Sequence, residues 1–228
     1  FYFGVAMIYD KMIELFRNPT VNYKGKPFWS WNGELERDEL IRQTNVMKEM
    51  GFGGFHMHTR VGMSTTYLSD EYMNFIKTCT DKAENDNMLA WLYDEDRWPS
   101  GAAGGIVTKE VKYRQRSLVM SVEAGREDEL IACYDVVLDD KGCLKKARLI
   151  GADDSAEGTK WYAYLHIRET DPWWNNQTYI NTLDPEAMKR FIEVTYDRYL
   201  ETVGEDFGGI VPAIFTDEPQ ISFKKELP

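Results

Sequence analysis

The sequence lacks the features that mark membrane, nucleic-acid-binding and disulfide-rich proteins. None of its 228 residues lie in an apolar run that approaches the roughly 18 residues of a membrane-spanning helix. The 27 Lys and Arg residues are outnumbered by 38 Asp and Glu residues, and the formal charge of −11 argues against nucleic-acid or anionic-membrane partners. The 3 cysteines are an odd number without metal-ligand spacing, so we interpret them as reduced, mostly structural thiols.

The two ends of the chain also lack familiar signals. Residues 1–12 are apolar and aromatic but have no cationic segment and no cleavage site of a signal peptide. This favours a cytoplasmic location, with residues 1–20 as an N-terminal extension. Residues 223–228 bring no closing helix, so we expect the chain to be truncated there.

What the sequence has is the composition of a globular protein, 43% hydrophobic and 29% charged, and a regular alternation of strand and helix patterns. Ser69 is expected to cap one helix, and Asp184 with Pro185 to begin another. Expected strands cover residues 27–33, 53–58, 88–93 and 210–216, and expected helices cover residues 36–50, 70–85 and 184–203. The unbroken apolar strand 88–93 indicates burial on both faces.

The alternation breaks between residues 106 and 180, where strand-like segments are separated by turns. Residues 139–142 have the composition of a hairpin turn. The expected strands are 117–122, 130–138, 144–150 and 161–167. We predict a small antiparallel β insertion after the third strand of the main sheet.

The order β-α-β-α-β-insertion-α-β predicts an α/β fold with a parallel sheet and right-handed crossovers. Four such units are half of a (β/α)8 TIM barrel, which takes about 250 residues. We therefore predict a half barrel from residues 21–105 and 181–228. An open doubly wound sheet is the alternative, but no strand-to-helix turn carries G-x-G-x-x-G or a P-loop.

Each predicted strand of the main sheet ends in polar or ionisable residues beside aromatic ones. In barrels, this carboxyl-terminal edge carries the chemistry. The candidate substrate-binding residues there are Trp29, Trp31, Asn32, His56, His58, Arg60, Tyr93, Asp94, Glu95, Trp98 and Asp217.

Aromatic side chains together with carboxylates suit a carbohydrate substrate, because sugar rings stack on aromatic faces while sugar hydroxyls bind acceptors and donors. Hydrolysis of a glycosidic bond needs a carboxyl group that protonates the leaving oxygen and a second carboxylate. A pocket that disfavours ionisation raises the pKa of such an acid. Glu218 is the candidate general acid, with Asp217 beside it to supply like-charge repulsion.

Structural roles compete with these functional ones. Glu218 could bind an arginine or cap a loop, and residues 94–96 could form a solvated loop or a cation site. His56 and His58 alternate with apolar residues, so both face one side of a strand, where a histidine is usually a satisfied core residue. Trp29 and Trp31 are as readily core residues as sugar platforms.

Four motifs in order resemble a known family. They are Pro27-Phe28-Trp29-Ser30-Trp31-Asn32, Gly53-Gly54-Phe55-His56-Met57-His58-Thr59-Arg60, Trp91-Leu92-Tyr93-Asp94-Glu95-Asp96-Arg97-Trp98-Pro99-Ser100-Gly101 and Phe215-Thr216-Asp217-Glu218-Pro219. Together they resemble the catalytic domain of bacterial glycoside hydrolases of family 106, which includes α-L-rhamnosidases. The resemblance runs from about residue 16 to residue 218.

This resemblance implies a (β/α)8 hydrolase that cleaves glycans with a pair of acidic residues. Glu218 matches the acid position at the end of the fourth strand, and the second carboxylate is implied on a later strand, in the remaining half of the barrel. Family members can bind Ca²⁺, to which residues 94–96 could contribute; no other cofactor is expected.

Two other functions stay open at this point. One is a non-catalytic carbohydrate-binding half barrel. The other is a metal-dependent hydrolase with His56 and His58 as ligands, which would need at least one more protein ligand. The remaining histidine, His166, lies in the predicted insertion.

Overall fold

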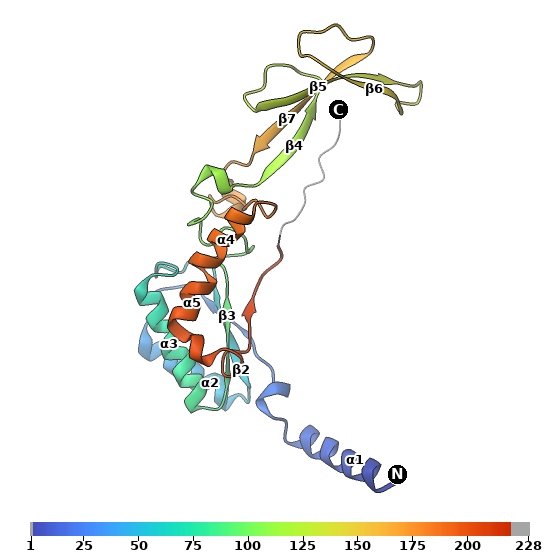
Figure 1. Ribbon diagram of the computed structural model, residues 1–228. Helices are drawn as coiled ribbons and strands as arrows, with labels where there is room; N and C mark the ends of the chain where they lie inside the picture. The colour runs from blue at the N-terminus through green and yellow to red at the C-terminus, as the bar shows by residue number, and fades with distance from the viewer. Residues whose placement is uncertain (1, 220–228) are drawn as a thin grey trace. The chain divides into compact units, whose positions relative to one another are not determined.

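The computed structural model describes residues 2–219, which divide into two compact units (Figure 1). Unit 1 comprises residues up to 104 together with residues 190–219, and unit 2 comprises residues 105–189. The predicted truncation at residues 223–228 lies outside the described residues. Each unit contains one four-stranded sheet.

The sheet of unit 1 is parallel throughout. Its strands are β1 (Phe28–Trp31), β2 (Gly54–Thr59), β3 (Leu89–Tyr93) and β8 (Ile214–Phe215), in the order β1-β2-β3-β8. The register pairs Trp31 with Thr59 and Tyr93 with Phe215, so the strands end at one common edge. The three strands predicted up to residue 93 are therefore confirmed, with end shifts of one or two residues.

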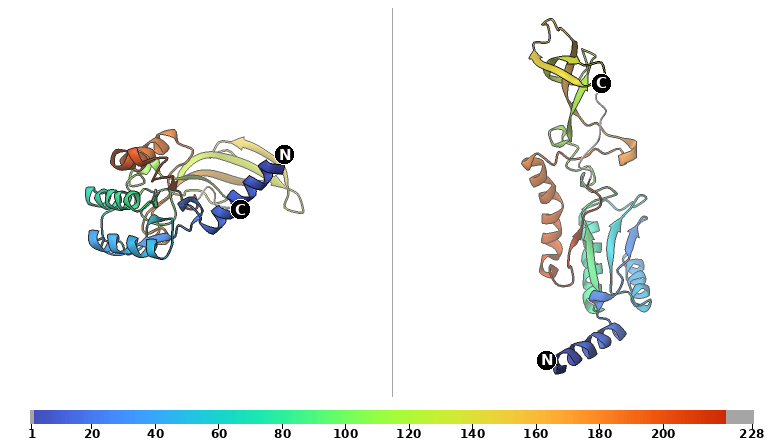
Figure 2. Two further views of the ribbon diagram at one scale, coloured as in Figure 1. Left: turned by 90° about the horizontal axis from the view of Figure 1, so that it is seen from below. Right: turned by 90° about the vertical axis from the view of Figure 1, so that its right-hand side faces the viewer.

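The α-helices are α1 (Tyr2–Arg17), α2 (Arg37–Glu49), α3 (Asp70–Asn85), α4 (Pro185–Val194) and α5 (Tyr196–Val203). The short 3-10 helices are η1 (Val21–Tyr23), η2 (Val111–Tyr113), η3 (Pro172–Trp174) and η4 (Gly204–Asp206). Figure 2 shows α2, α3 and α5 lined up along one side of the parallel sheet. None of the helices within residues 2–219 is both long enough and apolar enough to cross a membrane.

The predicted helix starts are confirmed by their hydrogen bonds. The hydroxyl of Ser69 accepts from the backbone N–H of Tyr72 at 3.2 Å. The carboxylate of Asp184 accepts from the backbone N–H of Glu186 at 3.0 Å. Both side chains thereby pair an N–H that the first turn of a helix leaves without a helical partner.

The prediction of one continuous helix over residues 184–203 was wrong. The helix is interrupted at Thr195, whose backbone has φ −107° and ψ −72°. The Thr195 hydroxyl donates to the carbonyl of Phe191 at 2.6 Å. A threonine that bonds back to the preceding turn in this way bends a helix, and periodicity alone does not reveal it.

The helix-covered face of the parallel sheet forms the core. Trp31, Phe55, Met57 and Leu92 are all 2% exposed or less and pack with the buried stripes of the helices. The stripe predicted for the second helix is largely buried, at Tyr72, Ile76, Cys79 and Ala83. Burial of such apolar side chains is the main stabilising contribution to a domain of this size.

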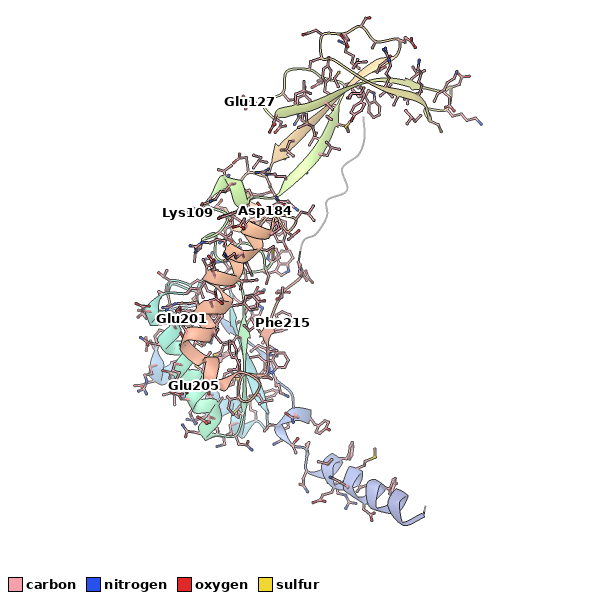
Figure 3. The ribbon with its side chains drawn as sticks, viewed as in Figure 1. Lys109, Glu127, Asp184, Glu201, Glu205 and Phe215 are labelled. Atoms are coloured by element: carbon pink, nitrogen blue, oxygen red, sulfur yellow. The ribbon has the colours of Figure 1, made fainter. Side chains whose placement is uncertain are left out.

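The opposite, helix-free face carries six rings, which we call the aromatic face. They are Phe28, His56, His58, Trp91, Tyr93 and Phe215. His58 stacks on Tyr93 with 3.9 Å between ring centroids, and Phe28 meets Phe215 at 5.0 Å. Figure 3 labels Phe215 on β8. Trp91 on this face is only half-buried, so the expectation that strand 88–93 is buried on both faces was wrong for the described residues.

The fourth strand is shorter than the predicted segment 210–216. Only Ile214–Phe215 forms a strand, and both residues are half-buried. The preceding backbone still runs beside β3, because the N–H of Ala90 donates to the carbonyl of Ile210 at 2.9 Å. Pro212 has no N–H to donate, which limits regular pairing along this segment.

Unit 2 contains an antiparallel sheet in the order β4-β7-β5-β6. Its strands are β4 (Arg116–Ser121), β5 (Glu129–Leu138), β6 (Leu144–Ile150) and β7 (Thr159–Ile167). Gly142, in the turn between β5 and β6, has φ +76°, a left-handed conformation that suits glycine. The four strands predicted between residues 106 and 180 are therefore confirmed.

Candidate functional site

The loops that follow β3 and β8 are tied together at the carboxyl edge of the parallel sheet. The backbone N–H of Asp94 donates to the carbonyl of Phe215 at 3.2 Å. Beyond the strands, Ser100 and Asp217 exchange two bonds: the Ser100 N–H donates to the Asp217 carbonyl, and the Asp217 N–H donates to the Ser100 hydroxyl, each at 2.9 Å. The segment 217–218 is thus attached to the loop after β3.

Glu218 lies at this edge with an exposed side chain. The indole Nε1–H of Trp98 donates to its Oε2 at 2.9 Å. Its backbone has φ +42°, a left-handed conformation that is uncommon for residues other than glycine. Such local strain persists only where surrounding contacts maintain it, and it clusters at functional sites. The described residues therefore leave Glu218 exposed and do not bury it.

Asp217 points toward the aromatic face, where its carboxylate lies 3.5 Å from Nε2 of His58. Burial raises the pKa of Asp217, and the charge of the neighbouring Glu218 raises it further, while Arg60 acts in the opposite direction. The like-charge repulsion expected between the two neighbouring carboxylates is thus one cause of the raised pKa of Asp217.

The two histidines of β2 occupy the aromatic face, as their alternation predicted. Burial lowers the pKa of His58 to about 4, and the positive charge of Arg60 adds to the effect. His58 is therefore neutral at pH 7. Burial also lowers the pKa of His56, whose Nδ1 lies 3.1 Å from the carbonyl of Lys26.

Asp94 is 1% exposed and accepts three hydroxyl hydrogen bonds. Ser100 donates to Oδ1 at 2.6 Å, while Thr216 and Tyr196 donate to Oδ2 at 2.6 and 2.9 Å. Burial raises the pKa of Asp94, and the three hydroxyls oppose that rise. Asp94 thus joins the loop after β3, the end of β8 and helix α5, and its carboxylate is occupied by protein groups.

Glu95 is fully buried, and its carboxylate accepts hydrogen bonds from five backbone N–H groups. The donors are Asp96, Gly101, Ala102, Ala103 and Gly104. Burial raises its pKa to about 7, and the N–H donors oppose the rise. The Glu95 side chain has no exposed surface, and both of its oxygens are already bonded within the protein.

The three acidic residues 94–96 do not form a Ca²⁺ site. Asp96 pairs with Arg97, with 2.9 Å between Oδ2 and Nε, while Asp94 and Glu95 bond to hydroxyls and backbone N–H groups. A calcium ion needs six to eight oxygens directed at one point. Within the described part of the chain, no group of three or more His, Cys, Asp or Glu side chains is placed to hold a metal ion. His56 and His58 have no third His, Cys, Asp or Glu ligand grouped with them among the described residues.

The two tryptophans of β1 lie in the core. Trp29 donates from its indole to the side chain of Gln43 at 2.6 Å, and Trp31 is 2% exposed against Tyr72. Of the two alternatives considered for them, core packing is the one that the described residues show. Asn32 and Arg60 follow β1 and β2 at the carboxyl edge, where both are exposed. Tyr93 is buried under the stacked ring of His58.

Sequence reasoning missed Tyr196, Ser100 and Thr216, the hydroxyl donors to Asp94. Ser100 and Thr216 lie inside the quoted motifs, so their position next to candidate residues was a usable signal. Tyr196 comes from helix α5, about one hundred residues away in sequence, and no local pattern points to it.

Comparison with known proteins gives one partial match. No family model matches this sequence, and no curated protein matches it. Among solved structures, the chain is similar to a rhamnosidase from Novosphingobium sp. PP1Y at 16% identity and a TM-score of 0.40. The match covers 57% of this chain and 17% of the rhamnosidase, so the chain spans a small part of that protein's length.

Proposed function

We propose that this chain belongs to a glycoside hydrolase in which Glu218 is the general acid. The observation that carries the proposal is the hydrogen bond of 2.9 Å from Trp98 to Glu218, at the edge where β3 and β8 end. This bond joins the exposed carboxyl group of Glu218 to the half-buried indole of Trp98, next to the ends of the two strands. Sugar-binding sites combine these two kinds of group.

The hydrogen bond also orients the carboxyl group of Glu218. Because Oε2 accepts the Trp98 N–H, the hydrogen bond fixes the orientation of this carboxyl group. The oriented carboxyl group then delivers its proton to the leaving oxygen as the glycosidic bond breaks. Asp217, held by Ser100, provides a second carboxylate for substrate hydroxyls.

The fold that we propose around this site is the first half of a (β/α)8 barrel. Helices cover one face of the parallel sheet and the aromatic face is on the other side, as in a barrel wall. The sequence motifs make α-L-rhamnosides the first substrates to test, ahead of other glycosides.

The test compares aryl glycosides with good and poor leaving groups in the complete protein. A leaving group that departs without protonation does not need a general acid, whereas a poor one does. We expect Glu218→Gln to lower kcat/KM on poor leaving groups by about 10²–10⁴-fold and to leave activated dinitrophenyl glycosides much less affected. Glu49→Gln, an exposed residue at the end of α2, is the matched control and retains full activity.

An equal loss on both kinds of substrate, or no loss, would show that Glu218 is not the acid. Sugar binding without turnover by the wild-type protein would instead favour a non-catalytic carbohydrate-binding function. Calorimetric titration with free rhamnose and related sugars separates that outcome from inactivity.

A further inference from the structure

Glu95 is a buried carboxylate that contacts no solvent and that the proposed reaction does not use. Its Oε2 accepts the N–H groups of Gly101, Ala102 and Ala103 at 3.0, 2.7 and 2.8 Å. Its Oε1 accepts those of Asp96 at 2.9 Å and Gly104. Five N–H donors on one carboxylate organise the loop around a single anion.

The loop conformation fits this arrangement. Gly101, Ala103 and Gly104 have φ of +136°, +52° and +63°, so the backbone turns repeatedly into left-handed conformations. Successive N–H groups of such a segment point inward and form a concave site for an anion. Here the anion is a side chain of the same protein, placed by the end of β3. Glu95 is also anchored through its carbonyl, which accepts the Thr59 hydroxyl.

Two residues of this loop, Trp98 and Ser100, form hydrogen bonds to the segment that contains the proposed acid. Asp96 and Gly101, both bonded to Glu95, flank the segment that contains Trp98 and Ser100. Trp98 donates to the carboxylate of Glu218, and Ser100 bonds to the backbone of Asp217 at both N and O. The Glu95 carboxylate is therefore linked to Glu218 through the backbone of segment 96–101 and the Trp98 indole.

We infer that Glu95 is a positioning residue: its carboxylate fixes the 96–104 loop and thereby holds the Trp98 indole against Glu218. This rests on the proposed role of Glu218 as general acid. Without the hydrogen bonds between Glu95 and the loop, Trp98 no longer orients Glu218, and proton delivery to the leaving oxygen is impaired. Contacts between the substrate and other residues persist.

The variant that tests this is Glu95→Gln in the complete protein. An amide offers one accepting oxygen and one NH2 group, so at least two loop N–H groups lose their acceptor. We expect hydrogen exchange at the backbone amides of residues 101–104 and at the Trp98 indole N–H to accelerate about tenfold or more. We also expect kcat/KM to fall mainly on poor leaving groups, as for Glu218→Gln. Glu95→Asp, which keeps the charge but shortens the reach, is a milder second variant.

Asp135→Asn is the matched control. Asp135 is 2% exposed and accepts backbone N–H groups of Glu157 and Gly158, but it lies in unit 2. A loss caused by destabilisation alone occurs in this control and is equal for all leaving groups.

The outcomes separate the two proposals. Unchanged exchange at the Trp98 indole in both Glu95 variants would overturn the positioning role, whatever the activity shows. Accelerated exchange together with a loss equal for all leaving groups would also overturn it as a role in proton delivery. If Glu218→Gln itself shows no dependence on the leaving group, the proposed acid is wrong, and accelerated exchange would still establish the link from Glu95 to Trp98.

Discussion

The rings of Phe28 and Phe215 meet with 5.0 Å between their centroids, although they come from the two opposite edges of the parallel sheet. Neighbouring strands lie about 4.8 Å apart, so β1 and β8 would be about 14 Å apart on a flat sheet. Side chains stand roughly perpendicular to a flat sheet and would not converge over that distance. The contact therefore indicates that the aromatic face is concave, which supports the half-barrel proposal.

This convergence predicts an energetic coupling between the two rings. In a double-mutant cycle of Phe28→Ala and Phe215→Ala, we expect a coupling of about 0.5–1.5 kcal/mol, because an edge-to-face pair contributes beyond its buried area. Denaturant unfolding of the four proteins measures it. Phe207→Ala, near η4, serves as a control in a second cycle with Phe28→Ala. The changes in the free energy of unfolding caused by these two substitutions should be additive. Full additivity of Phe28 with Phe215 would mean that the rings do not touch.

A second prediction concerns pH and His58. Its folded-state pKa of about 4 lies below the ordinary value of 6.5, mainly because of burial. Between these two values the unfolded chain binds the proton and the folded protein does not, so the free energy of unfolding rises as pH increases. The contribution of about 3 kcal/mol is complete above pH 6.5 and is lost as pH falls toward 4.

Urea unfolding between pH 4 and 7 measures this dependence. His58→Gln removes the titrating group, and we expect its free energy of unfolding to change less over the same pH range than that of the wild type. Equal slopes for the two proteins would assign the acid sensitivity to other groups. The carboxylate of Asp217 lies 3.5 Å from Nε2 of His58, so its own titration over this range is included in the wild-type slope.

A third prediction uses two glycines with opposite surroundings. A Cβ atom on Gly54 of β2 would lie 2.2 Å from the carbonyl oxygen of Leu89, its register partner on β3. Because the obstacle is backbone, we expect Gly54→Ala to lower the free energy of unfolding by about 1–3 kcal/mol or more. A Cβ atom on Gly33 would meet nothing within 4 Å, so Gly33→Ala should be nearly neutral. Thermal unfolding of the two variants tests this prediction. Equal stability of Gly54→Ala and Gly33→Ala would show that β2 and β3 are less closely paired.

Much of the secondary structure was accessible from the sequence because the determining signals are local. Ser69 and Asp184 begin helices through bonds to residues two or three positions on. The alternation of His56 and His58 with apolar neighbours placed both on one face of β2, because side chains of a strand alternate between faces. The same local logic located the candidate edge that contains Asp217 and Glu218.

The roles of individual site residues were not accessible in this way. Glu95 and Trp31 are among the most conspicuous residues of their motifs, yet both are fully enclosed. Whether a carboxylate or an indole faces solvent depends on elements that pack against it from elsewhere in the chain. The interruption at Thr195 is equally invisible to periodicity, since the apolar stripe continues across it.

Local sequence patterns were enough to predict the alternation of strands and helices, the caps and the two faces of β2, because each depends on neighbours a few residues apart. Three features depend on the folded chain instead: Tyr196 bonds to Asp94, Trp98 bonds to Glu218, and five backbone amides converge on Glu95. These contacts join segments from different strands, loops and helices. Their partners are selected by the curvature and packing of the assembled sheet, which local spacing does not specify.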